Sequence, residues 1–380
     1  MIRRTWSIVA LFGAALVVLA SCTSAPPPGP PGSHVISEGR TLHLVRIENG
    51  AIVEVASASI PAAGLLDGHQ IFNVIAHPSQ PWLYTASMNE CQEQVSWCWG
   101  NARIDRFVVS ANSITHAGAA FVHDASQVDI PCTQYAVDPA YVGQVGYCAP
   151  VGMAFNANAT RLYVDDDEDD VLHIFSVNAA GNLTFLHEGA NTEAHGLAID
   201  PTDTYLYNGS NVISVAGDVA TDVFDGMAGN ATSLVNLAGG AGLITTQWAD
   251  GVAVYDLADP LAPVLVDLYD FGGTRHARDL AFDPDLSRIL TLGREVVYAL
   301  SFDGATLSLD DTYVPPGAEV TEYRGVAMVP GGMALASWFV NDAGAISGGA
   351  DLFSVAADGT LALLDSVDYA NEARVVFALP

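Results

Sequence analysis

The chain has 380 residues, of which 50% are apolar, with 43 acidic residues, 13 basic residues and a formal net charge of −30. All 13 basic residues are arginines, which excludes an imine on a lysine as a catalytic device. The acidity also excludes nucleic acid as a partner and docking on anionic lipid headgroups.

The first 22 residues have the pattern of an export signal. Arg3 and Arg4 precede an apolar stretch, 6–18, that is too short to remain as a membrane span. The next residues, LASC at 19–22, resemble the lipobox of bacterial lipoproteins; a secretory signal with a chance cysteine is the alternative. The resemblance implies cleavage before Cys22, its acylation, and contact with the membrane through the lipid alone. The outer membrane, on its periplasmic or surface face, is then the favoured location.

A proline-rich segment separates this signal from the rest of the chain. Residues 24–33 read SAPPPGPPGS and cannot pack a core, so they predict a tether. We therefore expect a signal over 1–21, a lipidated cysteine and tether over 22–33, and one domain over 34–380. Loss of two positive charges, Arg3 and Arg4, with the signal takes the formal charge from −30 to −32. We expect the mature protein to be a monomer.

An apolar phrase recurs along the domain and divides it into units. The copies are NVIAHP (73–78), GMAFNA (152–157), GLAIDP (196–201), DLAFDP (279–284), GVAMVP (325–330) and VVFALP (375–380). The gap of 83 residues between the copies that begin at Gly196 and Asp279 predicts a degenerate copy near 233–238. Short runs with two-residue alternation follow the phrases, for example RLYVD, VLHIFSV and NLTFLHE, and predict four strands per unit.

Repeated units of four short strands without helices predict an all-β fold, a seven-bladed β-propeller of four-stranded antiparallel blades. Six blades come from 70–368. The seventh joins three strands within 34–58 to the last strand, 374–379, which closes the ring and removes exposed sheet edges. The phrases resemble the lactonase and YVTN group of β-propellers, above all in GLAIDPTDTYLY and DLAFDPDLSRIL. Residues 249–267 instead resemble the LVIVD repeat of bacterial surface proteins.

One register of these phrases collects charge. The position just before the phrase holds a basic side chain in four copies, and Phe72 and Val151 occupy it in the two earlier copies. The position two residues before this one holds a glutamate in three copies, a glutamine in one and a histidine in one. Equivalent positions of a propeller meet at one mouth of its central channel. The sequence thus predicts a cluster that contains His195, His276, Arg278, Arg324, Arg374, Glu322 and Glu372.

Two interpretations of this cluster stay open. As a ligand site, it would bind a carboxylate or phosphate through arginine, with a histidine or glutamate as general base and arginine at the oxyanion. The lactonase resemblance implies an Arg-His pair before the strand, but here Arg275 and His276 lie two residues further upstream. As a structural feature, the arginines and glutamates would only pair between blades.

An acidic run and four cysteines are further candidates. The run DDDEDD (165–170) would offer oxygen ligands to calcium, or form a solvated turn; its carboxylates of interest are Asp165, Asp166, Asp167, Asp169 and Asp170. We expect two local disulfides, Cys91–Cys98 and Cys132–Cys148, with other pairings or a zinc site as alternatives. The insertions that carry these cysteines are rich in tryptophan and tyrosine, which suits a binding lid or a simple cover of the mouth.

No GxSxG, HExxH or phosphate-binding glycine loop is present in the sequence. The leading interpretation is therefore an envelope lipoprotein whose propeller binds a small anionic or carbohydrate ligand or a surface protein. The family resemblance implies the alternative, a lactonase-like hydrolase of the 6-phosphogluconolactonase type that acts on a lactone or an anionic sugar derivative. Hydrolysis that depends on calcium, the one cofactor considered, is a third hypothesis.

Overall fold

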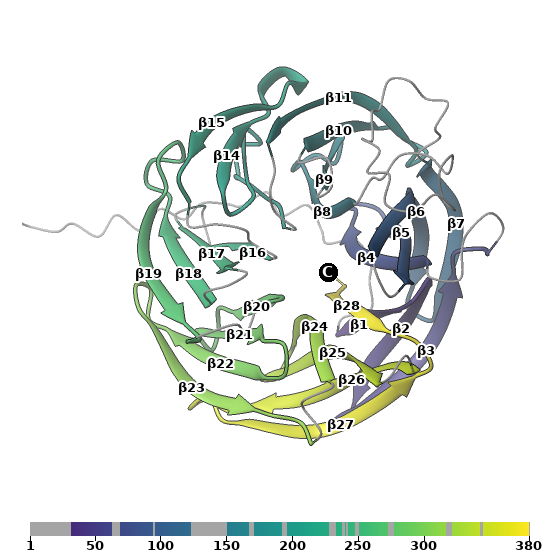
Figure 1. The fold of residues 1–380 in the computed structure, drawn as a ribbon, viewed down its shortest axis with the longest axis vertical. Helices are drawn as coiled ribbons and strands as arrows, with labels where there is room; N and C mark the ends of the chain where they lie inside the picture. Colours follow the sequence, from purple (N-terminus) through teal and green to yellow (C-terminus); the bar gives the residue numbers. More distant parts are fainter. Residues whose placement is uncertain are drawn as a thin grey trace, which may run out of the picture.

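The computed structural model of the protein describes residues 32–62, 69–93, 96–122, 150–166, 171–191, 196–227, 233–237, 240, 242–247, 251–272, 277–316, 321–342 and 345–379, without the side chains of 89–93, 96–101, 150, 191, 341, 342 and 345. These residues form seven four-stranded antiparallel sheets in a ring (Figure 1). The predicted seven-bladed β-propeller is confirmed.

We number the blades along the chain and start with the one that holds both chain ends. Blade 1 contains β28 (Ala373–Ala378), β1 (Ser33–Glu38), β2 (Thr41–Glu48) and β3 (Ala51–Ser59). Blade 2 contains β4 (His69–Ala76), β5 (Trp82–Glu93), β6 (Ser96–Ser110) and β7 (Ser113–Val122). Blade 3 contains β8 (Pro150–Phe155), β9 (Arg161–Asp166), β10 (Val171–Val177) and β11 (Leu183–Asn191).

The other four blades follow the same order, from the innermost strand outward. Blade 4 contains β12 (Ala198–Ile199), β13 (Tyr205–Tyr207), β14 (Asn211–Ser214) and β15 (Thr221–Asp225). Blade 5 contains β16 (Leu234–Asn236), β17 (Gly242–Gln247), β18 (Gly251–Asp256) and β19 (Val264–Asp270). Blade 6 contains β20 (Leu280–Asp283), β21 (Arg288–Leu292), β22 (Val297–Phe302) and β23 (Leu307–Tyr313), and blade 7 contains β24 (Thr321–Val329), β25 (Met333–Asp342), β26 (Ala345–Val355) and β27 (Leu361–Tyr369).

The ring closes in blade 1, where the last strand of the chain pairs with the first. β28 runs antiparallel to β1, with Ala378 opposite His34 and Val376 opposite Ile36. The Glu38 carboxylate strengthens the junction, because it accepts hydrogen bonds from the backbone and the side-chain amide of Asn371, both at 2.9 Å. The predicted closure by both chain ends is therefore confirmed, as is the degenerate copy near 233–238, which supplies β16.

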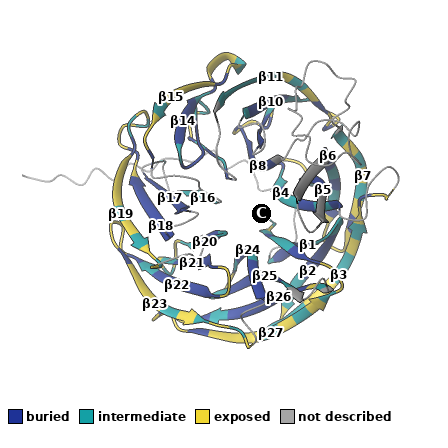
Figure 2. Ribbon diagram, in the orientation of Figure 1, coloured by how far each residue is buried: buried dark blue, intermediate teal, exposed yellow. Residues whose placement is uncertain are grey.

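The core of the protein lies between blades rather than within them. Seven apolar clusters of described residues each join two neighbouring blades, one cluster for every pair around the ring. Alternation along a strand sends successive side chains to opposite faces, and each face meets the next blade. Burial decreases outward, so that the outermost strands carry most of the exposed residues (Figure 2).

The glycine of the recurring phrase has a packing reason in blade 7. A Cβ atom at Gly325 would lie 2.6 Å from the backbone nitrogen of Val376 and 2.7 Å from the carbonyl oxygen of Arg374. Real Cβ contacts are not this short, so the innermost strands of blades 7 and 1 approach too closely for any side chain here. The glycine of the phrase is therefore required in blade 7 by the close approach of the innermost strands.

Helical structure is almost absent from the described residues. Apart from Gly240, which also has 3-10 geometry, the helical residues in these segments form one 3-10 turn, η1 (Ala216–Asp218). Across the same segments, the structure contains no helix with the length and apolar character needed to cross a bilayer. The predicted signal, its lipidated Cys22 and most of the tether lie outside the described residues.

Candidate functional site

A bulge in the innermost strand recurs at the register that the sequence singled out. The strand pairing shifts at Arg324 in β24, beside Arg374 in β28, at Phe72 in β4 and at Val151 in β8. In blade 6, Leu292 accepts a hydrogen bond from the backbone of Arg278 and donates one to the carbonyl of Asp279, so two residues face one. An extra residue bends a strand and redirects its side chain. The bulge thus gives this register its own orientation in five blades.

Small hydroxyl side chains hold two of these bulges. Ser337 of β25 accepts a hydrogen bond from the backbone nitrogen of Gly325, next to Arg324, at 3.0 Å. Ser37 of β1 accepts one from the backbone nitrogen of Val375, next to Arg374, at 2.9 Å. A backbone donor freed from the strand ladder must find another partner when it is buried. These serines therefore fix the strand segments that carry the two arginines.

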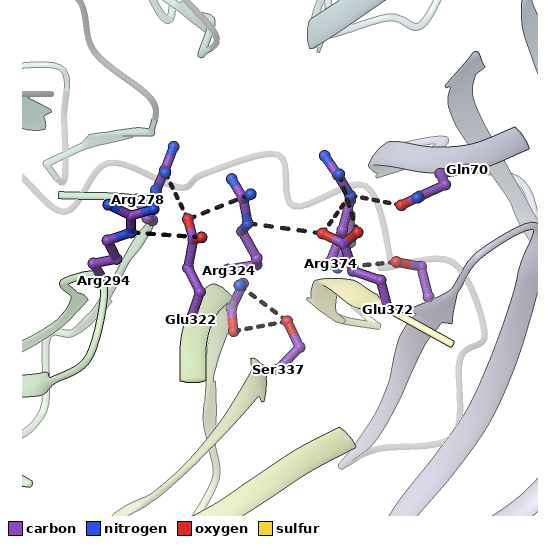
Figure 3. A network of polar contacts seen from close by, with 11 residues as sticks. Gln70, Arg278, Arg294, Glu322, Arg324, Ser337, Glu372 and Arg374 are labelled. Atoms are coloured by element: carbon purple, nitrogen blue, oxygen red, sulfur yellow. Dashed lines mark hydrogen bonds and ion pairs between the residues drawn. The ribbon is translucent and has the colours of Figure 1, made fainter. Parts of the chain in front are cut away.

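The bulged arginines and the acidic residues two positions upstream form one row across three blades (Figure 3). Glu322 of blade 7 receives Arg278 of blade 6, with Nη2 and Oε1 2.5 Å apart, and Arg324 of its own blade at 3.3 Å. Glu372, which precedes β28, lies 3.9 Å from Arg324 Nε and 2.8 Å from Arg374 Nε. Arg278 and Arg324 thus each reach the acidic group of the next blade.

Blade 2 ends this row with a neutral group. Gln70, two residues before Phe72, accepts a hydrogen bond from Arg374 Nε at 2.7 Å. Two aromatic rings support the cations: the Arg374 guanidinium lies 4.2 Å from the centre of the Phe72 ring, and that of Arg324 lies 5.0 Å from Phe339. Rings at this distance attract a guanidinium through their quadrupole. We call Arg278, Arg294, Glu322, Arg324, Glu372 and Arg374 the arginine row.

Positive charge exceeds negative charge in the arginine row. Arg294, in the turn between β21 and β22, is a fourth arginine; its Nε lies 3.9 Å from Glu322. Among these residues, four guanidinium groups face two carboxylates, in a protein whose net charge is −30. Burial and the guanidinium of Arg324 lower the pKa of Arg278 to about 9, against the opposing effect of Glu322. The row therefore gathers four of the chain's 13 arginines.

The residues of the arginine row differ in their access to solvent. The side chains of Glu372 and Arg374 are only 1% and 9% exposed, so they form the base of the row. Arg294 is 58% exposed and forms its outer end. In Figure 3 the guanidinium groups of Arg278, Arg324 and Arg374 project to the same side of the strands that carry them. One ligand could therefore meet several guanidinium groups at once.

Asp279, which follows Arg278, connects blades at the same level. Its carboxylate accepts hydrogen bonds from its neighbour Leu280 and from the backbone nitrogen of Val326 in blade 7, both at 2.8 Å. Burial raises the pKa of Asp279 to about 6, although hydrogen bonds from Val326, Ser233 and Leu280 oppose this rise. Ser233 belongs to the segment that leads into blade 5. Asp279 is thus a bridge between three blades that titrates close to neutral pH.

The structure brings together five of the seven cluster residues predicted from the sequence. Arg278, Glu322, Arg324, Glu372 and Arg374 lie in one row, and they do pair between blades, as the structural interpretation expected. The two histidines, His195 and His276, lie outside the described residues. Sequence reasoning missed Arg294, since the turn between the second and third strands of a blade has no place in the phrase register. A long-range contact of this kind leaves no local signal.

The acidic run is divided between described and other residues. Asp165 and Asp166 end β9 and are buried, so the alternative of a solvated turn is wrong for these two residues. Strand pairing extends through both of them, which removes them from the turn. Asp167, Asp169 and Asp170 lie outside the described residues. In the segments that the structure describes, no group of three or more potential metal ligands occurs, and calcium stays a prediction.

The cysteines are described only in part. The register of the β5–β6 hairpin sets Cys91 opposite Cys98, which is the arrangement that local pairing requires. The structure does not describe the side chains of Cys91 and Cys98, nor those of Trp97 and Trp99, which belong to β6. The whole of Cys132, Cys148, Tyr135, Tyr141 and Tyr147 lies outside the described residues. The two disulfides and the lid therefore stay predictions.

The fold and the arginine row define a seven-bladed β-propeller with a cationic cluster contributed by innermost strands. Its structure is similar to periplasmic gluconolactonase PpgL of Pseudomonas aeruginosa, with a TM-score of 0.65, 13% identity, and coverage of 92% of this chain and 99% of that chain. It is also similar to putative 6-phosphogluconolactonases of Bacteroides fragilis (TM-score 0.64, 11% identity, 91% and 97% coverage) and Bacteroides uniformis (0.61, 11%, 91% and 99%).

These likenesses concern the fold alone, because a propeller supports many unrelated functions. No family model matches the sequence, and no curated protein matches it either. The function must therefore be argued from the site.

Proposed function

We propose that this protein is a lactonase-like hydrolase of the cell envelope that opens a lactone at the arginine row. One observation carries the proposal: three successive blades each contribute a bulged arginine to a row in which four guanidinium groups face two carboxylates. Lactone hydrolysis develops negative charge on the carbonyl oxygen and ends in a carboxylate, and guanidinium groups stabilise both. Similarity to propellers named as gluconolactonases supports this choice over other hydrolases.

The chemistry assigns different roles to the members of the row. Glu322 accepts a proton from water as the water oxygen bonds to the lactone carbonyl carbon. Arg278 and Arg324, both within 3.3 Å of Glu322, stabilise the resulting oxyanion. The ring C–O bond then breaks and the leaving alkoxide takes the proton from Glu322, which gives a hydroxy acid; the new carboxyl group releases its proton to solvent and leaves as a hydroxycarboxylate. Arg374, held by Glu372 and Gln70, positions the neighbouring strand and attracts the product carboxylate.

An anion-binding module without turnover is the second candidate. It is favoured by the engagement of both carboxylates: Glu322 and Glu372 are each in contact with guanidinium groups, which occupy the oxygens that a general base would turn towards water. In this case the arginine row would bind a small anion, such as a sugar acid, and present or store it. The leading interpretation from sequence, a binding module, is retained in this form.

Turnover and binding are separated by one set of variants. We would screen γ- and δ-lactones with the mature chain carrying Cys22→Ser, and compare it with the double variant Arg324→Gln/Arg374→Gln. The expected result is a loss of at least about a hundredfold in kcat/KM, since removal of one oxyanion-stabilising group alone costs roughly that factor. Turnover retained by the double variant would exclude the arginine row as the catalytic site.

A matched control is available on the opposite face of the ring. Arg161 begins β9, beyond the downstream end of β8, and its guanidinium forms two hydrogen bonds to Asp218 at 2.5 and 2.7 Å. Arg161→Gln removes an arginine–carboxylate pair without touching the arginine row. Turnover should survive this change. If it does not, loss of activity in the double variant reports stability and not chemistry.

We also propose that the protein is anchored in the envelope by a lipid on Cys22, with the outer membrane favoured. The signal pattern supports this location, and so does the periplasmic location named for the Pseudomonas relative of the fold. Labelling with a radioactive fatty acid should mark the native protein and not a Cys22→Ser variant. A label that persists in the variant would contradict the assignment.

A further inference from the structure

An eighth apolar cluster lies apart from the seven that hold the blades together. It consists of Met88 and Val151, which are buried, and Phe72, which is partly exposed. The neighbouring core between blades 2 and 3 is a separate cluster and contains none of the three. The eighth cluster also joins blades 2 and 3, at the end of β4 and β8 that carries the bulges.

Two members of the eighth cluster occupy the register of the arginines. Phe72 and Val151 are the bulged residues of β4 and β8, as Arg324 is in β24. The two sets meet directly, since the Arg374 guanidinium lies 4.2 Å from the centre of the Phe72 ring. Around the ring, blades 6, 7 and 1 therefore present cations and blades 2 and 3 present apolar groups. The cationic arc and the apolar arc are continuous.

We infer that the ligand is an amphiphilic anion, whose acidic group binds the arginines while an alkyl or aryl portion lies on Phe72, the partly exposed member of the eighth cluster. For the proposed hydrolase, on which this inference rests, the substrate class is an alkyl- or aryl-substituted lactone. A polyhydroxylated lactone fits less well. Its hydroxyl groups would lose water against the Phe72 ring, which offers no strong hydrogen-bonding group in return.

The first test compares γ-lactones that differ only in the length of the alkyl chain on the ring. With the mature Cys22→Ser chain, kcat/KM should rise roughly fourfold for each added methylene up to about four carbons, the usual effect of burying one methylene. Phe72→Gln should flatten this dependence, and Phe72→Leu should keep most of it. Leu309→Gln, on the exposed outer strand β23, is the control and should change nothing.

The second test does not require turnover. Binding of 4-hydroxyoctanoate, 4-hydroxybutanoate and gluconate is measured by calorimetry, with melting curves to confirm that each variant is folded. The inference is supported if 4-hydroxyoctanoate binds at least tenfold more tightly than the other two ligands and if Phe72→Gln abolishes this preference. This holds even if the protein hydrolyses no lactone, in which case only the proposed activity fails. Equal or tighter binding of gluconate, or no binding of any of the three, overturns the inference, whatever the protein hydrolyses.

Discussion

Replacement of Glu322 by glutamine gives the sharpest test of the arginine row. The carboxylate lies between Arg278 and Arg324, at 2.5 and 3.3 Å, and its side chain is largely buried. The substitution keeps the shape and one acceptor oxygen but leaves the four arginines with a single carboxylate. Loss of one partner from a buried pair costs about 3–5 kcal/mol, and the retained acceptor reduces this to about 2–3 kcal/mol. Arg294 adds little, because it is mostly exposed and 3.9 Å away.

The expected change in melting temperature follows from the size of the domain. A domain of about 350 residues has an unfolding entropy of about 0.7 kcal/mol per kelvin, so the variant should melt about 3–4 °C below the wild type. Differential scanning calorimetry in dilute buffer measures this shift. Glu295→Gln is the matched control, since Glu295 is exposed in the same turn as Arg294 and carries the same charge. The control should melt within about 1 °C of the wild type.

Added anion distinguishes a binding site from simple repulsion. A hydroxycarboxylate that binds the arginine row should raise the melting temperature of Glu322→Gln more than that of the wild type, because it replaces the missing charge. It should have no extra effect on Glu295→Gln. Equal melting temperatures for both variants, or equal effects of the anion on them, would refute the electrostatic account of this row.

Three further predictions concern stability. The pKa of Asp279 is raised from 3.8 to about 6, so the folded state binds this proton more tightly than the unfolded state, and the stability that the proton provides is lost as pH rises from about 4 to 6. The unfolding free energy of the wild type, minus that of Asp279→Asn, should therefore fall by up to about 3 kcal/mol over this range. A difference that does not change with pH would contradict this prediction. Tyr323 donates a hydrogen bond to the buried Asp351 at 2.6 Å, so Tyr323→Phe should lower the free energy of unfolding by about 1–3 kcal/mol, as measured by denaturant titration. Tyr205→Phe, which changes a partly exposed tyrosine, should lower it by less. Removal of 373–380 deletes β28 and leaves the edge of β1 unpaired, so the chain should aggregate or fail to fold. Size-exclusion chromatography and melting curves test this; a soluble monomer with an unchanged melting temperature would show that closure of the ring is dispensable.

The sequence determined the architecture because the architecture depends on local patterns. Two-residue alternation, turn residues and the recurring phrase fix where each strand begins and which face it buries, and six copies of one phrase are enough to count blades. The join between the two chain ends also followed from the sequence, since a lone fourth strand at the C-terminus has a partner only in the first three strands. Register alone even predicted that Arg278, Arg324 and Arg374 would be neighbours.

Only the tertiary structure decided how these side chains meet. Arg278, Arg324 and Arg374 each reach a polar group of the next blade, and this offset depends on the rotation between blades, which no segment of sequence encodes by itself. Arg294 joins Glu322 from a turn of the preceding blade, and Phe72 lies against Arg374 although 302 positions separate them. Ion pairs and ring contacts of this range depend on distances of a few ångströms between separate sheets. The sequence thus supplied the residues of the site, and the closed ring supplied their geometry.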